Sequence, residues 1–323
     1  MSDAINHYLC AKDLLEEGPI SFPVNERLLF LGSQGPDIFL YYNVLESQES
    51  KIPLGDRLHK EQINDFFYHG LLTCLHAPES YKPILRSYYI GMICHHALDV
   101  ATHPFIFYRS GSYLEDRPET LPFKHNHKKY EIQLDMAYYH MRTGEKAHNF
   151  QVHRLFDVPA MAADILEYFY AETLKATFGI SMEKGTVRKS LEKAKKLTRV
   201  LSDPTGLKRL AVGFGEILAG DPGKFSTAFY GIKPMDPTLV LNLDKSIWRH
   251  PCDDTQAFTD SYPELCQKAQ EDIRQKIPLI DPMLLGQKEV DRTVLDNCFK
   301  DLGYETGLDW KTSPPIQYFD PIL

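Results

Sequence analysis

The sequence lacks any run of about 18 uninterrupted apolar residues, so we expect no membrane-spanning helix. Residues 1–8 lack the basic start and apolar stretch of a secretion signal, and we therefore expect a cytoplasmic protein. Basic residues are also in deficit, with 36 Lys and Arg against 44 Asp and Glu and a net charge of -8. General nucleic-acid binding is not expected, because neutralising phosphates needs an excess of basic side chains.

Cysteine is sparse, and its spacing excludes the common cysteine-based sites. No two of the six cysteines form a CxxC pair, and all of them lie far apart in the chain. In a reducing compartment this pattern predicts buried free thiols instead of disulfides or a thiolate metal site. The residues concerned are Cys10, Cys74, Cys94, Cys252, Cys266 and Cys298.

Apolar residues recur mainly at helical spacing, which predicts an all-α fold: a multi-helix bundle with a helical C-terminal elaboration. Pro104 is expected to end or kink the central helix at His103, because proline disfavours helical backbone in the residue before it. We expect residues 1–150 to form the core and 151–323 an extension packed on it. Helices are predicted at residues 4–15, 25–31, 37–44, 60–76, 81–103, 125–141, 159–178, 184–201, 207–218, 260–276 and 288–302, with loops at 46–56, 110–122 and 220–254 and an extended tail at 312–323.

Histidine is concentrated in the first half of the chain, where eleven of the thirteen lie before residue 150. His95, Asp99 and His103 are spaced at i, i+4 and i+8, so they share one face of the most apolar predicted helix. A buried unpaired carboxylate at Asp99 would cost several kcal/mol, and metal ligation removes that cost. His96 stands at i+3 and i+7 from Asp99 and His103, so helix geometry alone does not decide between His95 and His96.

A second pair at the same spacing is formed by His127 and Glu131. Two helices presenting such pairs to one cleft would supply several ligands for divalent cations, although an ordinary helix surface pair has the same spacing. Asp135 continues the face and is a candidate for orienting a ligand imidazole.

Three further candidate metal ligands precede these two sets of residues in the sequence. Asp37 follows a Gly-Pro turn and is either a ligand or an ordinary helix N-cap. His59 precedes an aromatic helix, and His7 lies in the first predicted helix. Each of these residues alone is weak evidence for a metal site.

Taken in order, these residues resemble the zinc-dependent phospholipase C family. That all-α family includes bacterial phospholipases C and the N-terminal domain of the glycosylphosphatidylinositol-specific phospholipase D, and the resemblance covers about residues 1–140. It implies one zinc held by Asp37, His59, His95 and Asp99, and a second held by His103, His127 and Glu131. The family's third zinc would use His7 and Asp99. Secreted bacterial members complete that third position with a processed N-terminal Trp, whereas six residues precede His7 here, so we expect this position to be completed differently, weak or empty.

The resemblance implies a phosphodiester hydrolase that uses metal-activated water, with Asp37 as general base and Asp99 bridging two ions. The expected substrate is a phospholipid or another phosphodiester, and the products are a phosphomonoester and an alcohol. Two other functions remain open: a catalytically inactive, metal-stabilised scaffold, and a nuclease of the trinuclear zinc type. Manganese, iron, cobalt or nickel would also suit His and carboxylate ligands.

Overall fold

The computed structural model describes residues 4–42, 54–231 and 233–323, and almost all of its regular structure is helical. One small antiparallel sheet of two strands lies among the described residues. None of the described helices is both long and apolar enough to cross a bilayer. The elements in order are α1 (Ala4–Glu17), α2 (Glu26–Gly32), η1 (Gly35–Phe39), α3 (Leu54–Lys60), α4 (Ile63–His76), α5 (Lys82–Ser110), η2 (Pro118–Phe123), α6 (Asn126–Thr143), η3 (Ala147–Asn149), η4 (Val152–Phe156), α7 (Ala160–Phe178), α8 (Thr186–Leu201), α9 (Leu207–Ala219), η5 (Ser226–Ala228), α10 (Pro237–Val240), β1 (Trp248–His250), β2 (Asp253–Phe258), α11 (Tyr262–Leu284) and α12 (Arg292–Phe299).

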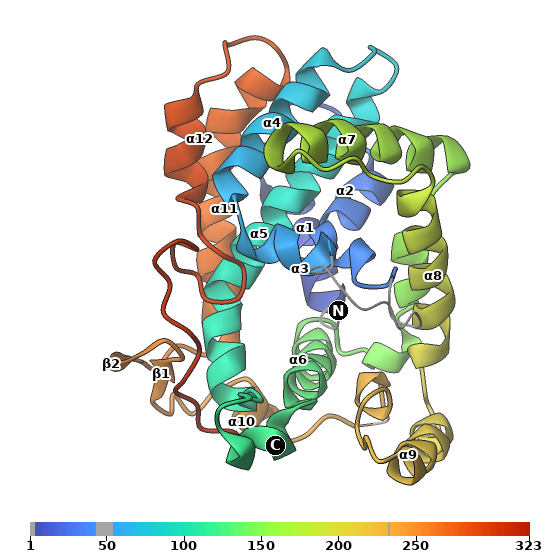
Figure 1. Cartoon of the computed structure of the whole chain (residues 1–323), viewed down its shortest axis with the longest axis vertical. Helices are drawn as coiled ribbons and strands as arrows, with labels where there is room; N and C mark the ends of the chain where they lie inside the picture. The colour runs from blue at the N-terminus through green and yellow to red at the C-terminus, as the bar shows by residue number, and fades with distance from the viewer. Residues whose placement is uncertain (1–3, 43–53, 232) are drawn as a thin grey trace.

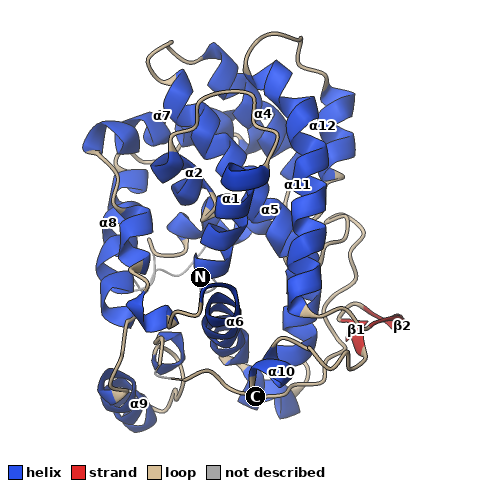
Figure 2. Cartoon of the chain, turned by 180° about the vertical axis from the view of Figure 1, so that it is seen from behind, coloured by secondary structure: helices blue, strands red, loops and turns tan. Residues whose placement is uncertain are grey.

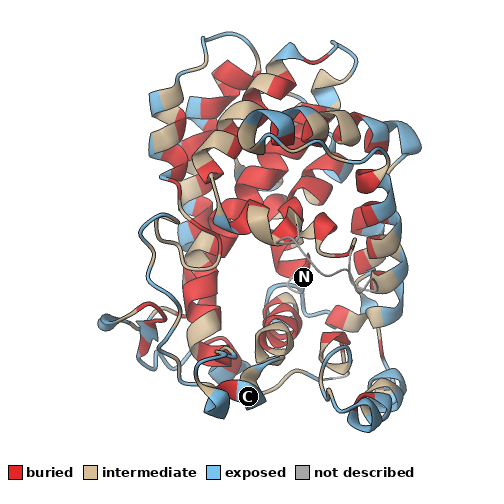
Figure 3. Ribbon diagram, viewed as in Figure 1, coloured by how far each residue is buried: buried red, intermediate tan, exposed pale blue. Residues whose placement is uncertain are grey.

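Helix α5 is the centre of the fold, with α2 and α11 packed most extensively against it (Figure 1). Its residues are buried along most of its length, whereas α8 and α9 expose much of their surface (Figure 3). Figure 2 shows the same helical arrangement from behind, with the small hairpin at the edge of the molecule. The predicted all-α fold is therefore confirmed. All six cysteines are buried and free, as their spacing predicted.

The contact between α2 and α5 is unusually close because glycine stands on both sides. A Cβ atom on Gly32 would lie 2.2 Å from the Tyr88 carbonyl oxygen, and one on Gly91 would lie 2.2 Å from that of Leu29. Only glycine lets two helix backbones approach so nearly. This contact brings Ser33, the residue after α2, to the polar face of α5.

Of the two alternatives predicted at His103, an end or a kink, the end was wrong, since α5 continues through Pro104 to Ser110. Proline at position 104 removes the amide that would bond the Val100 carbonyl. The loop after α12 packs onto this carbonyl: Gly307, at φ +64°, approaches so closely that a Cβ atom there would lie 2.7 Å from the Val100 oxygen. Tertiary packing, absent from the local pattern, thus covers the freed carbonyl group.

Several other boundaries also differ from the predictions. The predicted helix 60–76 is divided at Gln62, whose left-handed φ of 53° separates α3 from α4, and α3 begins inside the predicted loop 46–56. In place of a helix at 37–44 the chain forms the 3₁₀ helix η1; residues 43–53 lie outside the described residues. Helix α11 runs past Pro278 and Pro282 instead of ending at 276. The predicted loop 220–254 contains η5, α10, β1 and the start of β2.

Candidate metal centre

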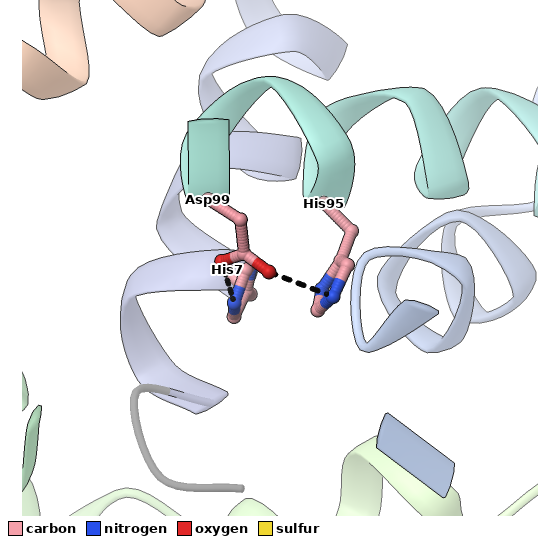
Figure 4. A group of neighbouring side chains, drawn as sticks. All are labelled: His7, His95 and Asp99. Atoms are coloured by element: carbon pink, nitrogen blue, oxygen red, sulfur yellow. Dashed lines mark ion pairs between the residues drawn. The ribbon is translucent and has the colours of Figure 1, made fainter. Parts of the chain in front are cut away.

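Helix α5 presents His95, Asp99 and His103 on one face, as their spacing predicted. The His95 Nε2 atom lies 3.1 Å from Asp99 Oδ2, and the His103 Nδ1 atom lies 3.6 Å from Asp99 Oδ1. His7 approaches from α1 and places its Nε2 atom 3.2 Å from Asp99 Oδ1. Figure 4 shows one oxygen of the Asp99 carboxylate directed at His7 and the other at His95, and the two imidazole rings stack with centroids 4.1 Å apart. Asp99 therefore offers its two oxygens to imidazoles of different helices.

Two further groups of three residues adjoin this one. The first joins Asp37, His59 and His95, with 3.1 Å between His59 Nε2 and Asp37 Oδ1 and 3.5 Å between the two Nε2 atoms. In each of the three groups, all ligand atoms lie within 4.8 Å of one another.

The other group joins His103, His127 and Glu131 across α5 and α6. Glu131 Oε1 lies 3.4 Å from His103 Nε2 and 2.9 Å from His127 Nε2. The structure thus brings together all eight residues for which the resemblance implies metal ligation. We call these residues the cluster: His7, Asp37, His59, His95, Asp99, His103, His127 and Glu131. The pairing of His7 with Asp99 agrees with the third ligand set that the resemblance implies. The grouping differs from the first implied set, because the group of Asp37, His59 and His95 does not include Asp99, and His95 also belongs to the group of His7 and Asp99.

Backbone carbonyl oxygens fix the orientation of three of the imidazoles. The Nδ1 atoms of His59, His95 and His103 lie 2.7, 3.0 and 3.0 Å from the carbonyl oxygens of Gly55, Ser33 and Tyr304. Because a carbonyl can only accept, Nδ1 donates in each case. A neutral ring in this tautomer keeps its lone pair on Nε2, the nitrogen that faces the carboxylates. Histidine ligands of metals in proteins are oriented by outer hydrogen bonds of this kind.

No sequence pattern identifies these three partners, since any residue carries a carbonyl. Tyr304 lies 201 residues beyond His103, in the loop after α12. Its own amide donates to the His59 carbonyl oxygen over 3.0 Å, and its buried ring packs against His59 and His95. The C-terminal part of the chain therefore builds one wall of the cluster.

The cluster holds its carboxylates ionised in spite of burial. Burial alone would raise the pKa of Asp99, but the neighbouring imidazoles of His95, His103 and His7 hold that pKa well below its ordinary value. The pKa of Glu131 is likewise well below its usual range: burial acts against ionisation, and His127 and His103 outweigh it. For Asp37 burial is outweighed by His59 and His95 among others, and the pKa again falls.

Burial also disfavours the charged form of His95, and here it outweighs the neighbouring carboxylates: the pKa of the imidazole is lowered and the neutral ring is favoured. Imidazole nitrogens and carboxylate oxygens are ligands that bind zinc in proteins, so the residues present fit the metal. The buried carboxylate anions need a cation for full compensation.

The cluster opens into a cleft of about 220 Å³. Among the exposed parts of the cluster, the side chain of Asp37 is 14% accessible and that of His127 is 29% accessible. Substrate would therefore enter past these two residues. The walls are completed by side chains that the sequence did not single out as site residues: Leu40, Asp56, Phe107 and Glu305.

Two candidates from the sequence have other roles in the structure. His96 turns away from the cluster: its Nε2 atom lies 3.0 Å from the Leu302 carbonyl oxygen, and burial lowers its pKa to about 3. Asp135, considered for orienting an imidazole, accepts hydrogen bonds from the amides of Ile5 and Asn6 at the start of α1. The positive end of the helix dipole stabilises a carboxylate at this position, so Asp135 anchors the helix that carries His7.

Gly35 provides a test of how tightly His95 must be positioned. Its φ is +50°, and a Cβ atom there would lie 2.3 Å from His95 Cδ2. We expect Gly35→Ala to displace the ring and to lower the affinity for zinc by about 10- to 100-fold, as loss of an orienting contact does. Competition with a fluorescent zinc chelator measures this affinity.

Gly144→Ala is the matched control, because Gly144 also has a positive φ, +75°, but nothing lies within 4 Å of the added Cβ atom. It imposes a similar backbone penalty without touching the cluster. Equal zinc affinities of the two variants would contradict the proposed role of Gly35.

The chain matches the family model for zinc-dependent phospholipase C over residues 6–178. This stretch contains all eight residues of the cluster and extends beyond the first 140 residues that carried the resemblance in the sequence. No curated protein and no solved structure matched the chain in the corresponding comparisons. The match covers more than half of the 323 residues and agrees with the helical fold and with the three groups of potential ligands. The chain therefore belongs to the zinc-dependent phospholipase C family.

Proposed function

We propose that this protein is a zinc-dependent phosphodiester hydrolase of the phospholipase C type, acting on a phospholipid or another phosphodiester. The observation that carries the proposal is the convergence of five imidazoles and three carboxylates on one cleft, with the Nε2 atoms of three oriented imidazoles facing inward. Family membership supports the same reaction class.

The residues that would hold zinc are those of the three groups. Divided as the family resemblance implies, His103, His127 and Glu131 would form one position, Asp37, His59, His95 and Asp99 the second, and His7 with Asp99 would contribute to a third. The structural groups use the same eight residues but place Asp99 with His7 and His95. Bound zinc supplies Lewis acidity for the phosphoryl oxygen and lowers the pKa of water toward about 7.

Asp37 is the candidate general base. Its carboxylate reaches the cleft and is ionised at neutral pH, so it is placed to accept the proton of an attacking water. The water oxygen forms a bond to phosphorus as the bond between phosphorus and the alcohol oxygen breaks. The alcohol leaves with a proton, and the phosphomonoester remains.

Replacing the base should reduce turnover more than it reduces metal content. We expect Asp37→Asn to lower kcat per bound zinc by at least about 10²-fold, the smaller end of what general base catalysis contributes. Hydrolysis of bis-p-nitrophenyl phosphate, normalised to zinc measured by elemental analysis, gives this number.

Asp56→Asn is the control for removing a negative charge from the same cleft. Asp56 lines the cleft from α3 but belongs to none of the three groups of potential ligands. We expect its kcat per bound zinc to remain close to that of the unaltered protein. A similar loss in both variants would indicate that cleft charge, and not a base at Asp37, determines the rate.

A panel of substrates separates the proposed hydrolase from its alternatives. The purified protein should contain two or more zinc ions per chain and hydrolyse bis-p-nitrophenyl phosphate or phosphatidylcholine, with both activities removed by chelator. Zinc content without turnover would instead identify a metal-stabilised scaffold. Preferential cleavage of single-stranded nucleic acid would identify a nuclease.

A further inference from the structure

Helix α9 exposes an apolar face that no other described part of the chain covers. Five large apolar side chains on this helix are between 65% and 74% exposed: Leu207, Leu210, Phe214, Ile217 and Leu218. Their spacing of three, four, three and one residues places them along one side of the helix. Single exposed apolar residues are ordinary, but a contiguous exposed face marks an interaction surface.

More exposed apolar residues follow α9 in the sequence. Phe225, Leu239, Leu243 and Ile247 are 39% to 62% exposed. Nine of the sixteen exposed large apolar side chains of the described residues therefore fall within positions 207–247. Both α9 and α10 lie at the lower end of the molecule in Figures 1 and 2. The two helices that carry most of these residues thus lie at one end of the fold.

The two carboxylates nearest the apolar face of α9 are buried, whereas Asp236 and Asp244 further along the chain are exposed. Glu216, the acidic residue of α9, is buried and accepts hydrogen bonds from the amides of Gly223 and Ser226 and from the Ser226 hydroxyl. Asp203 is also buried and accepts from the amides of Lys208 and Arg209 at the start of the helix. Neither carboxylate is presented on the surface.

Basic side chains remain around the apolar face. Lys208 and Arg209 at the start of α9 are exposed. Lys224, shortly after the end of the helix, is also exposed but lies 3.6 Å from the Asp221 carboxylate. A helix with exposed apolar residues and a basic rim is complementary to the surface of a bilayer that contains anionic lipid. A two-fold symmetric dimer through this face would bring the same basic residues of two copies together, which charge repulsion disfavours.

The segment that carries this surface is joined to the helix that carries part of the metal cluster. Asp221, which follows α9, lies 2.7 Å from His125 Nε2 and 3.0 Å from Lys124 Nζ. These two residues immediately precede α6, which holds His127 and Glu131. The short helix η5 also packs on α6. Docking through α9 would therefore hold the cluster at a fixed distance from the lipid surface.

We propose that α9 is an interfacial helix whose exposed face enters the headgroup boundary of a bilayer containing anionic phospholipid. The surface lies outside the cleft, and its binding to lipid does not depend on hydrolysis there. Where both proposals hold, the substrate is a lipid presented at a membrane and not a freely diffusing phosphodiester.

Vesicle flotation of the full-length, zinc-loaded protein tests the proposal. We expect binding to vesicles of equal parts phosphatidylcholine and phosphatidylglycerol, weakened by added salt. The double variant Leu210→Ser with Phe214→Ser should lower the partition coefficient by at least about 10-fold, because two apolar side chains are removed from the bilayer. Its hydrolysis of soluble bis-p-nitrophenyl phosphate should equal that of the unaltered protein.

Met161→Ser with Leu279→Ser is the matched control, since these side chains are 66% and 50% exposed but lie on α7 and α11. This control should retain full vesicle binding.

Absence of binding by the unaltered protein, or full binding by the α9 double variant, would overturn the proposal. So would a solution dimer that the α9 variant dissociates, because the face would then be a subunit interface. Vesicle binding by a protein that hydrolyses no phosphodiester would support docking while refuting the proposed activity.

Discussion

Asparagine in place of Asp99 is expected to remove both bound zinc and hydrolysis. Asp99 faces His7 with one oxygen and His95 with the other, so the substitution takes a shared anionic ligand from the middle of the cluster. Metal ions contribute several kcal/mol of transition-state stabilisation. If about 5 kcal/mol of it is lost, the rate falls by nearly 10⁴-fold. Elemental analysis and hydrolysis of bis-p-nitrophenyl phosphate measure the two effects.

Asp281→Asn is the control for substituting a buried aspartate elsewhere. Asp281 is as deeply buried as Asp99, at 1% exposure, and it accepts hydrogen bonds from Ser21. The variant should retain its zinc and its rate. Full zinc content and full activity in Asp99→Asn would rule out the proposed centre.

Removal of metal is expected to destabilise the fold as well as to stop turnover. The cluster collects three ionised, buried carboxylates, and a bound cation compensates their charge. A ligand present at 1,000 times its Kd stabilises the folded state by about 4 kcal/mol per site. At roughly 2 °C per kcal/mol for a chain of this size, loss of one such site lowers Tm by about 8 °C. Differential scanning calorimetry with and without chelator checks this value.

Added zinc should restore the original Tm, whereas magnesium should not, because magnesium prefers all-oxygen coordination with several waters. The Asp99→Asn variant supplies the internal control: its Tm should not respond to chelator. An unaltered protein whose unfolding is the same with and without chelator would contradict the structural role of the metal.

The parts of the site that were predictable are those in which spacing along one helix determines proximity. Asp99 and its neighbours at i−4 and i+4 must share a face once α5 forms, and the same holds for His127 and Glu131 on α6. The meeting of α5 with α1, η1 and α3 came from the family resemblance, since no local pattern brings His7, Asp37 and His59 together.

Helix geometry alone could not decide whether His95 or His96 faces the cluster. Both positions are adjacent on α5, and both side chains are buried. The close contact of Gly32 with Gly91 and the left-handed Gly35 set the Ser33 carbonyl and the η1 backbone against position 95. Position 96 instead faces the aromatic rings of Phe67 and Phe299. Such long-range packing is not encoded in the local sequence pattern.

The C-terminal half was the least predictable part. Helix α11 continues through two prolines and packs along α5, and the loop after α12 reaches the histidines, although no motif marks either segment. We propose that residues 1–150 form the hydrolytic core and residues 151–323 an extension that completes it. Under this proposal the extension contributes to the site through the backbone of Tyr304 and through Glu305 at the cleft.

The hydrogen bond between His103 and the Tyr304 carbonyl has a consequence for biosynthesis. A chain emerges from the ribosome amino end first, so His95 and His103 of α5 have emerged long before residue 304 has been made. Until then His103 lacks the acceptor that orients its ring, and the wall beside His59 is missing. Stable loading of zinc should therefore follow translation of nearly the whole chain, and truncated nascent chains should hold the metal weakly.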